Sequence, residues 1–197
     1  MIAATLPTMF KTHRRPHTMH PARLLHMGGS QRRARGSNGM DGTAGLLAGA
    51  AAGAAGTAAL NAATYLDMAV RGRPASDTPE RTVEAVAGRA HLPIPGKGEK
   101  RSHRVTALGA LSGMTTGVAV GVAAAALHRL GVRPPTLVGA ALTGLVAMAA
   151  TDASMAGLKV TDPRTWSATD WISDLLPHFV YGAVTYATLR ALHDPTR

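Results

Sequence analysis

The stretch VTALGALSGMTTGVAVGVAAAAL, residues 105–127, decides the fold. It contains no charged side chain, and as a helix rising 1.5 Å per residue it can cross a hydrocarbon core of about 30 Å. In water each interior glycine would cost this helix about 1 kcal/mol relative to alanine, whereas in lipid a row of glycines lets another backbone approach closely. The stretch therefore predicts the central packing seam of a helical membrane protein. The glycines that recur every four residues along one side of it are Gly109, Gly113, Gly117 and Gly121.

The composition of the whole chain favours the same class. Aromatic residues make up only 4% of the 197 residues, and alanine and glycine supply most of the apolar content. A soluble core of this size would use more large apolar side chains, whereas helices that pack closely in lipid use small ones. The chain has no cysteine, which excludes disulfides and thiolate metal sites.

Most of the basic residues behind the net charge of +10 lie in two segments, residues 1–36 and 71–104. A basic chain can bind nucleic acid, but neither segment has interleaved aromatic residues or a recognisable nucleic-acid-binding fold. Basic segments that flank charge-free stretches are typical of membrane proteins, whose cytoplasmic loops are enriched in Lys and Arg. We therefore expect the lipid bilayer as a partner and no nucleic acid.

Residues 1–40 are predicted to form a disordered basic tail. They contain seven Lys and Arg residues, no acidic residue and no apolar periodicity. Three interpretations stay open: a cytoplasmic tail that meets anionic lipid, a targeting sequence, or a stretch that is not translated. We favour the last, in which translation starts at Met27 or Met40.

Three further charge-poor stretches predict additional spans, so the expected fold is all-α, an integral membrane four-helix bundle. Small residues recur every four positions in the first span and match the glycines of the second. This predicts close packing of the two spans within one chain, with a contact between two chains as the alternative. Pro177 is expected to kink the fourth span. The first-span glycines are Gly45, Gly49 and Gly53, and the spans are about 43–69, 105–127, 136–156 and 172–192.

The segment 71–104 between the first two spans is predicted to contain a short helix. Thr78-Pro79-Glu80 combines an N-cap, a proline at the first helical position and an acid in the first turn, and the helix should end near Ala90. We expect it on the membrane surface, with a solvated loop helix as the alternative. If the chain starts at Met40, ten Lys and Arg residues share the side of this segment against four on the other, which makes the segment cytoplasmic. With the basic tail included, the count is ten against eleven and decides nothing.

Two ionisable residues inside the predicted spans are candidate functional groups, since such residues are energetically costly in lipid and often functional. Asp152, late in the third span, and His178, early in the fourth, would meet if these spans pack antiparallel. Such a pair can relay protons, hold a cation or lock two helices together. The simpler alternative is that Asp152 ends its helix at the interface and His178 hydrogen-bonds a backbone carbonyl.

A second group of polar residues lies near the end of the first span. Asp67 is expected to pair with Arg71 one turn later, a contact worth a few tenths of a kcal/mol. Asn61 and Tyr65 share its face, which predicts a polar pocket or, more simply, hydrogen bonds between helices. Tyr181 and Tyr186, beside or on the face of His178, complete the candidate intramembrane polar site.

Two motifs carry a resemblance to known families. The pattern Trp171-x-Ser173-Asp174-x-x-Pro177-His178-x-Val180-Tyr181 resembles the last span of small bacterial inner-membrane proteins of the YagU-like family. The segment Tyr65-x-Asp67…Arg71-Gly-Arg-Pro74…Thr78-Pro-Glu80 is similar to one in uncharacterised four-span membrane proteins of high-GC bacteria. The resemblance implies a multi-pass protein of the bacterial plasma membrane, and it implies no activity, because these families are largely of unknown biochemical function.

The sequence does not predict an enzyme. No two residues make a convincing nucleophile–base pair, and no cofactor or metal motif rises above background. We expect a non-enzymatic integral membrane protein that acts by helix association, with itself as a homo-oligomer or with another membrane protein. The alternative is a proton- or cation-coupled channel or transporter that uses Asp152 and His178.

Overall fold

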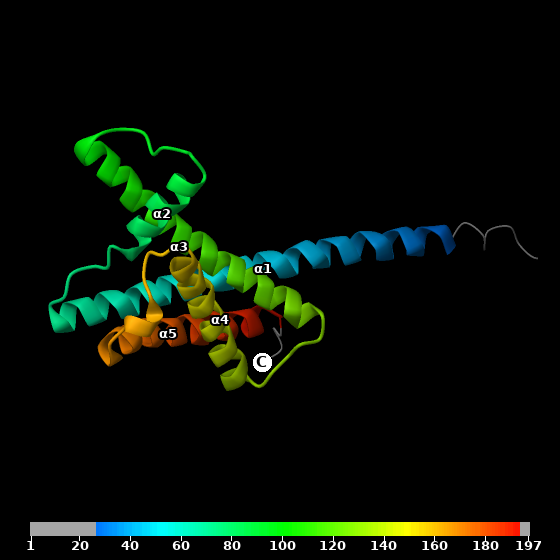
Figure 1. Ribbon diagram of the computed structural model, residues 1–197. Coiled ribbons are helices and arrows are strands. Elements are labelled where there is room, and N and C mark those ends of the chain that lie inside the picture. Colours follow the sequence, from blue (N-terminus) through cyan, green and yellow to red (C-terminus); the bar gives the residue numbers. More distant parts are fainter. Residues whose placement is uncertain (1–26, 194–197) are drawn as a thin grey trace, which may run out of the picture. The chain divides into compact units, whose positions relative to one another are not determined.

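The computed structural model describes residues 27–193, and for residues 27–41 it describes the backbone alone. Within these residues the chain is entirely helical, without a strand (Figure 1). By its contacts the chain divides into two units, residues 1–40 and 41–197. The helices are α1 (Met27–Arg71), α2 (Thr78–Arg89), α3 (Gly98–Arg129), α4 (Thr136–Gly157) and α5 (Ala168–His193), with a short 3₁₀ helix, η2, at Pro163–Thr165.

Each predicted span lies inside one observed helix. Three helices are long and apolar enough to cross a membrane, namely the Gly42–Arg71 part of α1, α3 and α4. α5, the predicted fourth span, is not among them, because its charged and polar side chains lower its mean hydropathy. It continues through Pro177 without a break. An all-helical chain with three helices able to span a membrane is thus established, and the four-span bundle stays a prediction.

Helix α1 begins earlier than predicted. Residues 27–40, expected to be disordered, form its first turns. No proline lies between Pro21 and Pro74, and the run Gln31–Arg35 has high helix propensity, so the helix extends backwards from the apolar span despite the poor helix formers at residues 36–39. The rest of the predicted tail, residues 1–26, lies outside the described residues.

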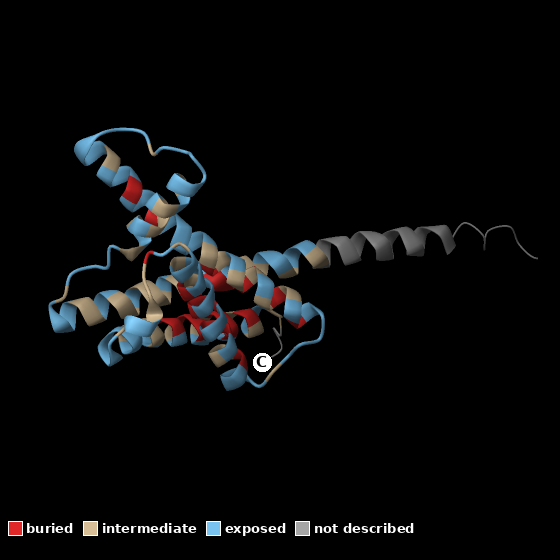
Figure 2. Ribbon diagram, in the orientation of Figure 1, coloured by how far each residue is buried: buried red, intermediate tan, exposed pale blue. Residues whose placement is uncertain are grey.

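Small and polar side chains form much of the interior of residues 42–193, and most large apolar side chains are exposed. Figure 2 marks the buried residues in red along the helices. Ala52, Ala125 and Leu189 make up a fully buried cluster. By contrast Leu47 is 65% exposed and Leu137 is 85% exposed. This distribution is the reverse of that in a water-soluble domain, where large apolar side chains are the ones most often buried. The buried polar residues are His128, Thr143, Asp152, His178 and Thr185.

α1 and α3 pack antiparallel with their glycines in contact. A methyl group added at Gly49 would lie 2.7 Å from the carbonyl oxygen of Gly121, and one at Gly121 would lie 2.6 Å from the Cα of Gly53. A methyl group at Gly53 would collide with the carbonyl oxygen of Gly117. Real Cβ atoms do not come this close to backbone atoms, so the two helices approach to this distance only because the positions are glycine.

The other glycines of the predicted seam have different surroundings. A methyl group at Gly109 would lie 3.2 Å from Pro79 at the start of α2, and one at Gly45 would lie 3.2 Å from the side chain of Arg129. At Gly113 a methyl group would meet nothing within 4 Å. The glycine row of α3 therefore divides into a contact with α2, an open position and a contact with α1.

A second close contact joins α4 to α5, which also run antiparallel. A methyl group at Gly144 would lie 2.5 Å from the carbonyl oxygen of His178, and one at Gly182 would lie 2.5 Å from the backbone nitrogen of Gly144. Further along, the ring of Tyr186 lies directly against Gly139. These two glycine contacts determine the register between the two helices.

The helix expected in segment 71–104 is α2. Its N-cap is Asp77, one residue before the predicted cap, and none of its residues is buried. Two of its arginines reach the end of α4: Arg81 Nη2 donates to the carbonyl oxygen of Val160 at 2.6 Å, and Arg89 Nη2 donates to that of Gly157 at 2.7 Å. The arginines thereby bring donors and positive charge to a helix C-terminus, where carbonyls lack partners and the helix dipole is negative.

Alanine substitutions at two glycines of α3 test the α1–α3 contact. We expect Gly121→Ala to lower the free energy of unfolding in detergent micelles by about 1–3 kcal/mol, because the added methyl group overpacks the contact with α1. Gly113→Ala is the matched control on the same helix. It should leave stability unchanged or raise it by up to about 1 kcal/mol through helix propensity. Equal losses at both positions would contradict the described packing.

Candidate functional site

The α4–α5 contact determines which side chains meet toward one end of these helices. Asp152 follows Gly144 by eight residues, and Asp174 precedes Gly182 by eight, so each lies about 12 Å along its helix from the contact and on the same face. Because α4 and α5 are antiparallel, a residue after Gly144 on α4 and a residue before Gly182 on α5 lie toward the same end of the helix pair. There the carboxyl groups of Asp152 and Asp174 lie within interaction distance, with His178 beside them.

His178 is held by the residue one turn before it. Its Nδ1 lies 2.8 Å from the backbone oxygen of Asp174 and 3.3 Å from the Oδ1 of the same residue. Both oxygens accept hydrogen bonds, so Nδ1 carries a proton. Asp152 is 9% exposed, and the His178 side chain is 11% exposed. Among the described hydrogen bonds none joins Asp152 directly to His178. Asp174 is the direct partner of His178, so the site consists of three residues instead of the expected pair.

Two carboxyl oxygens in this group have no donor. Asp152 Oδ1 and Asp174 Oδ2 are buried and make no hydrogen bond within the described part of the chain. Burying a polar oxygen without a partner costs about 1–3 kcal/mol, and more when it is charged. Two neighbouring carboxylates also repel each other. A proton or a cation between the two groups would remove both costs.

The two tyrosines of the predicted site anchor α5 instead. The Tyr181 hydroxyl donates to the carbonyl oxygen of Gly117 on α3 at 2.6 Å, and the Tyr186 hydroxyl donates to that of Pro134 before α4 at 2.8 Å. Tyr181 is 1% exposed. Both hydroxyls bind backbone carbonyls and so hold helices together, as tyrosines in tightly packed helix interfaces commonly do.

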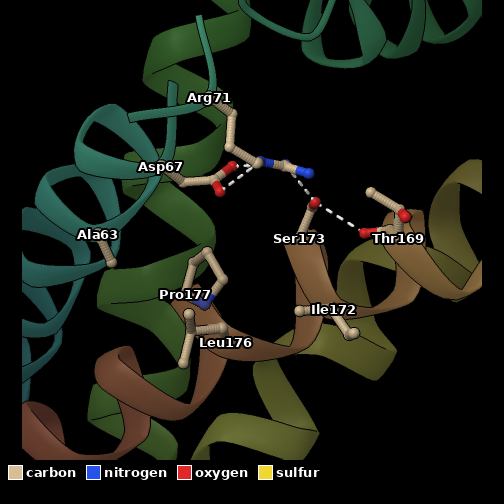
Figure 3. Close-up of a pocket in the computed structure, with 8 residues that line it drawn as sticks. All are labelled: Ala63, Asp67, Arg71, Thr169, Ile172, Ser173, Leu176 and Pro177. Carbon is tan, nitrogen blue, oxygen red and sulfur yellow. Dashed lines mark hydrogen bonds and ion pairs between the residues drawn. The ribbon is translucent and has the colours of Figure 1, made fainter. Parts of the chain in front are cut away.

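Asp67 binds two arginines at the end of α1. Arg71 Nε lies 2.7 Å from Asp67 Oδ1, as the spacing predicted, and Arg73 Nε lies 2.6 Å from Oδ2. Arg71 Nη2 also donates to Ser173 Oγ at 2.6 Å and so links α1 to α5 (Figure 3).

A cavity of about 260 Å³ adjoins this link. Figure 3 shows polar side chains along one edge of it and apolar side chains along the other. Asn61 is half-buried and Tyr65 is 63% exposed, and neither lines the cavity, so the polar pocket expected around Asp67 has other walls. Those walls are formed by Ala63, Asp67, Arg71, Thr169, Ile172, Ser173, Leu176 and Pro177.

A second pair of titratable residues lies where α3 and α5 end. The rings of His128 and His193 are 5.1 Å apart, and His128 Nδ1 and His193 Nε2 are buried without a hydrogen-bond partner in the described chain. Arg133 and Arg190 act electrostatically on His128. These residues escaped the sequence analysis because they are distant in sequence and follow no shared motif.

The loop between α4 and α5 is stabilised by local polar contacts. Hydrogen bonds from Arg164 hold the pKa of Asp162 below its usual value, and the hydroxyl and backbone N–H of Ser167 do the same for the pKa of Asp170. In residues 27–193 no three His, Asp or Glu side chains come together as a metal site would require.

Asp174 is the member of the site that sequence reasoning missed as a partner. In the sequence it stands out only as a member of the motif that resembles YagU-like proteins. The usable signal was its spacing, since four residues separate it from His178 and place both on one helix face. Arg73 was missed because it follows the helix end, where no periodicity applies.

Comparison of the chain with protein-family models, with curated proteins and with solved structures gave no match. The resemblance to YagU-like proteins therefore stays a prediction from the motifs alone.

Proposed function

We propose that this chain is an integral membrane protein with four spans, formed by α1, α3, α4 and α5. The observation that carries the proposal is the outward face of α5. Between residues 171 and 192 every exposed residue of α5 is apolar, while His178 and Thr185 point inward. A helix on the surface of a soluble protein has the opposite arrangement. The exposed residues are Trp171, Ile172, Leu176, Phe179, Ala183, Ala187, Ala191 and Leu192.

The polar side chains of α5 are covered by its neighbours, which explains how a helix of modest hydropathy can span. The Thr185 side chain lies against Gly56 of α1, and the Tyr181 hydroxyl is bonded to Gly117 of α3. The backbone of His178 lies against Gly144 of α4, and its side chain is 11% exposed. Polar groups that face the interior of a helical bundle do not meet lipid. The mean hydropathy of α5 thus understates how apolar its outward face is.

We infer that α2 lies at the cytoplasmic surface of a bacterial plasma membrane. The excess of Lys and Arg in segment 71–104 supports this orientation. Trp166 and Trp171, whose rings are 5.1 Å apart at the start of α5, are suited to the interface at the same end. The motifs shared with bacterial inner-membrane proteins support the location.

The function that we propose is non-enzymatic, namely association with a second copy or with another membrane protein. The large outward side chains of the four helices offer apolar contact area in the bilayer. On α3 the open position at Gly113 would let another helix approach closely.

Single-cysteine variants test the four spans, because the chain has no native cysteine. With an impermeant thiol reagent, Lys97→Cys and Ser167→Cys should react only from the cytoplasmic side, and Arg133→Cys and Thr196→Cys only from the other. Reaction of positions 167 and 196 from one side would mean that α5 does not cross. Reaction of position 97 from outside would reverse the orientation.

Purification from native membranes in mild detergent tests the association. We expect the protein to be recovered in a complex. Gly113→Leu should abolish this complex while the fold persists, since no atom of the described chain lies within 4 Å of a methyl group at this position. Ala119→Leu, exposed on another face of α3, is the control and should keep the complex. Recovery of the wild-type protein as a lone monomer would reject the association.

A second candidate function is proton- or cation-coupled transport. It is favoured by the buried carboxyl oxygens of Asp152 and Asp174 that lack hydrogen-bond partners. Ionisable groups of this kind inside spans are common in ion and proton pathways.

Ion flux into liposomes tests this candidate. Vesicles containing the wild-type protein should show proton or cation flux across a pH gradient, and Asp152→Asn should reduce that flux at least about tenfold, as expected for loss of an essential relay group. Asp162→Asn, in the loop outside the spans, should have no effect. Wild-type vesicles without flux at any pH would exclude the transport function.

A further inference from the structure

The carboxyl groups of Asp152 and Asp174 carry like charge when ionised, and each has a buried oxygen that accepts no hydrogen bond in the described chain. Asp152 is nine-tenths buried with its Oδ1 unpartnered. On the facing helix the Asp174 side chain is 23% exposed, but its Oδ2 is buried and also has no hydrogen-bond partner in the described chain. The two carboxyl groups interact across the α4–α5 contact. A hydrogen atom between them would turn a repulsive contact into a short O–H···O bond to a carboxylate, which is among the stronger hydrogen bonds in proteins.

The charge balance of the group favours one proton on the pair. The charges that act on Asp152 in the described chain are those of Asp174 and His178. With both carboxyl groups ionised, the group has a net charge of −2 beside a neutral His178 and −1 beside a charged one. One proton on the carboxyl pair removes one negative charge in either case, which a buried site tolerates better.

The charged groups of α1 and α2 that reach this end of the molecule are already bound to other groups. On α1, Asp67 is held between Arg71 and Arg73. On α2, the two arginines that reach the end of α4 bind backbone carbonyls. α3 has no charged side chain in residues 105–127. None of these contacts supplies a cation or a donor to the carboxyl pair.

We propose that Asp152 and Asp174 hold a single proton between them, which makes the α4–α5 contact a buried proton-binding site. The proposal rests on the membrane embedding proposed above, because surrounding lipid keeps out the water that would otherwise solvate two carboxylates. His178 is a positioning residue, since its Nδ1–H contacts Asp174 and orients that carboxyl group.

Proton release has a mechanical consequence at this site. The proton leaves, both carboxyl groups become anionic, and their repulsion acts across the contact at Gly144 and Gly182. Proton uptake therefore tightens the packing of α4 on α5, and release loosens it.

Infrared spectroscopy of the full chain in phosphatidylcholine vesicles tests the proposal. We expect the carbonyl stretching band of a protonated carboxyl group at pH 7, and we expect its loss in both Asp152→Asn and Asp174→Asn. Asp162→Asn should keep the band, because hydrogen bonds from Arg164 lower the pKa of Asp162 and keep it ionised at this pH. Absence of the band at pH 7, or its survival in either variant of the pair, would overturn the proposal.

The buffer cation separates a bound proton from a bound metal ion. Replacing sodium with choline should leave the band unchanged, whereas a band that appears only in choline would mean that sodium occupies the site, which overturns the proposal.

Unfolding as a function of pH gives a second measurement on the wild-type chain, which remains informative if a variant fails to fold. A proton bound by the folded state but not by the unfolded state stabilises the fold as the pH falls. The thermal midpoint should therefore rise from pH 8 to pH 6, and Asp152→Asn should flatten this rise. A midpoint that is constant or falls over this range would overturn the proposal. Cysteine labelling that shows four spans without the infrared band would reject the proton site alone and leave the membrane topology intact.

Discussion

Contact between helix backbones at glycine is the constraint on which the rest of this structure depends. It occurs twice, where Gly49 of α1 meets Gly121 of α3 and where Gly144 of α4 meets Gly182 of α5. Helices that touch through their backbones leave little interior volume, so most large apolar side chains point outward. Alanine, threonine and tyrosine hold many of the interior positions, and the hydroxyl groups of Thr143, Tyr181 and Tyr186 bind backbone carbonyls. Small-residue packing and inverted polarity are thus two results of one geometric cause.

The helices and their glycine faces could be predicted from the sequence because both depend on local periodicity. Charge-free length placed each predicted span inside one observed helix. The pairing of Asp152 with Asp174 could not be predicted, since it depends on the register between two helices, which follows from where Gly144 meets Gly182. Nor could periodicity distinguish Gly113 from Gly121, because equivalent positions on one helix face different neighbours. The early start of α1 was missed because basic charge and the absence of apolar periodicity predict disorder, whereas a helix can continue from an adjacent apolar span without either signal.

α5 shows why composition averaged over a helix misleads when the helix packs among several others. Between residues 171 and 192 its polar residues are concentrated on the side that contacts the other helices, and every exposed residue is apolar. The mean hydropathy averages over both faces of the helix, although only one of them would meet lipid. The assignment of each residue to a face required the packing of α1, α3 and α4 around it. The acid pair and His178 lie on the covered face, where burial gives their charges the greatest energetic weight.

The arginines of α2 connect the basic segment 71–104 to the end of α4 and to the loop after it through hydrogen bonds to backbone carbonyls. Arg89 holds the carbonyl of Gly157, which lies five residues beyond Asp152 on the same helix. A force on α2 would therefore act on the end of α4 that carries Asp152 through the Arg89 side chain.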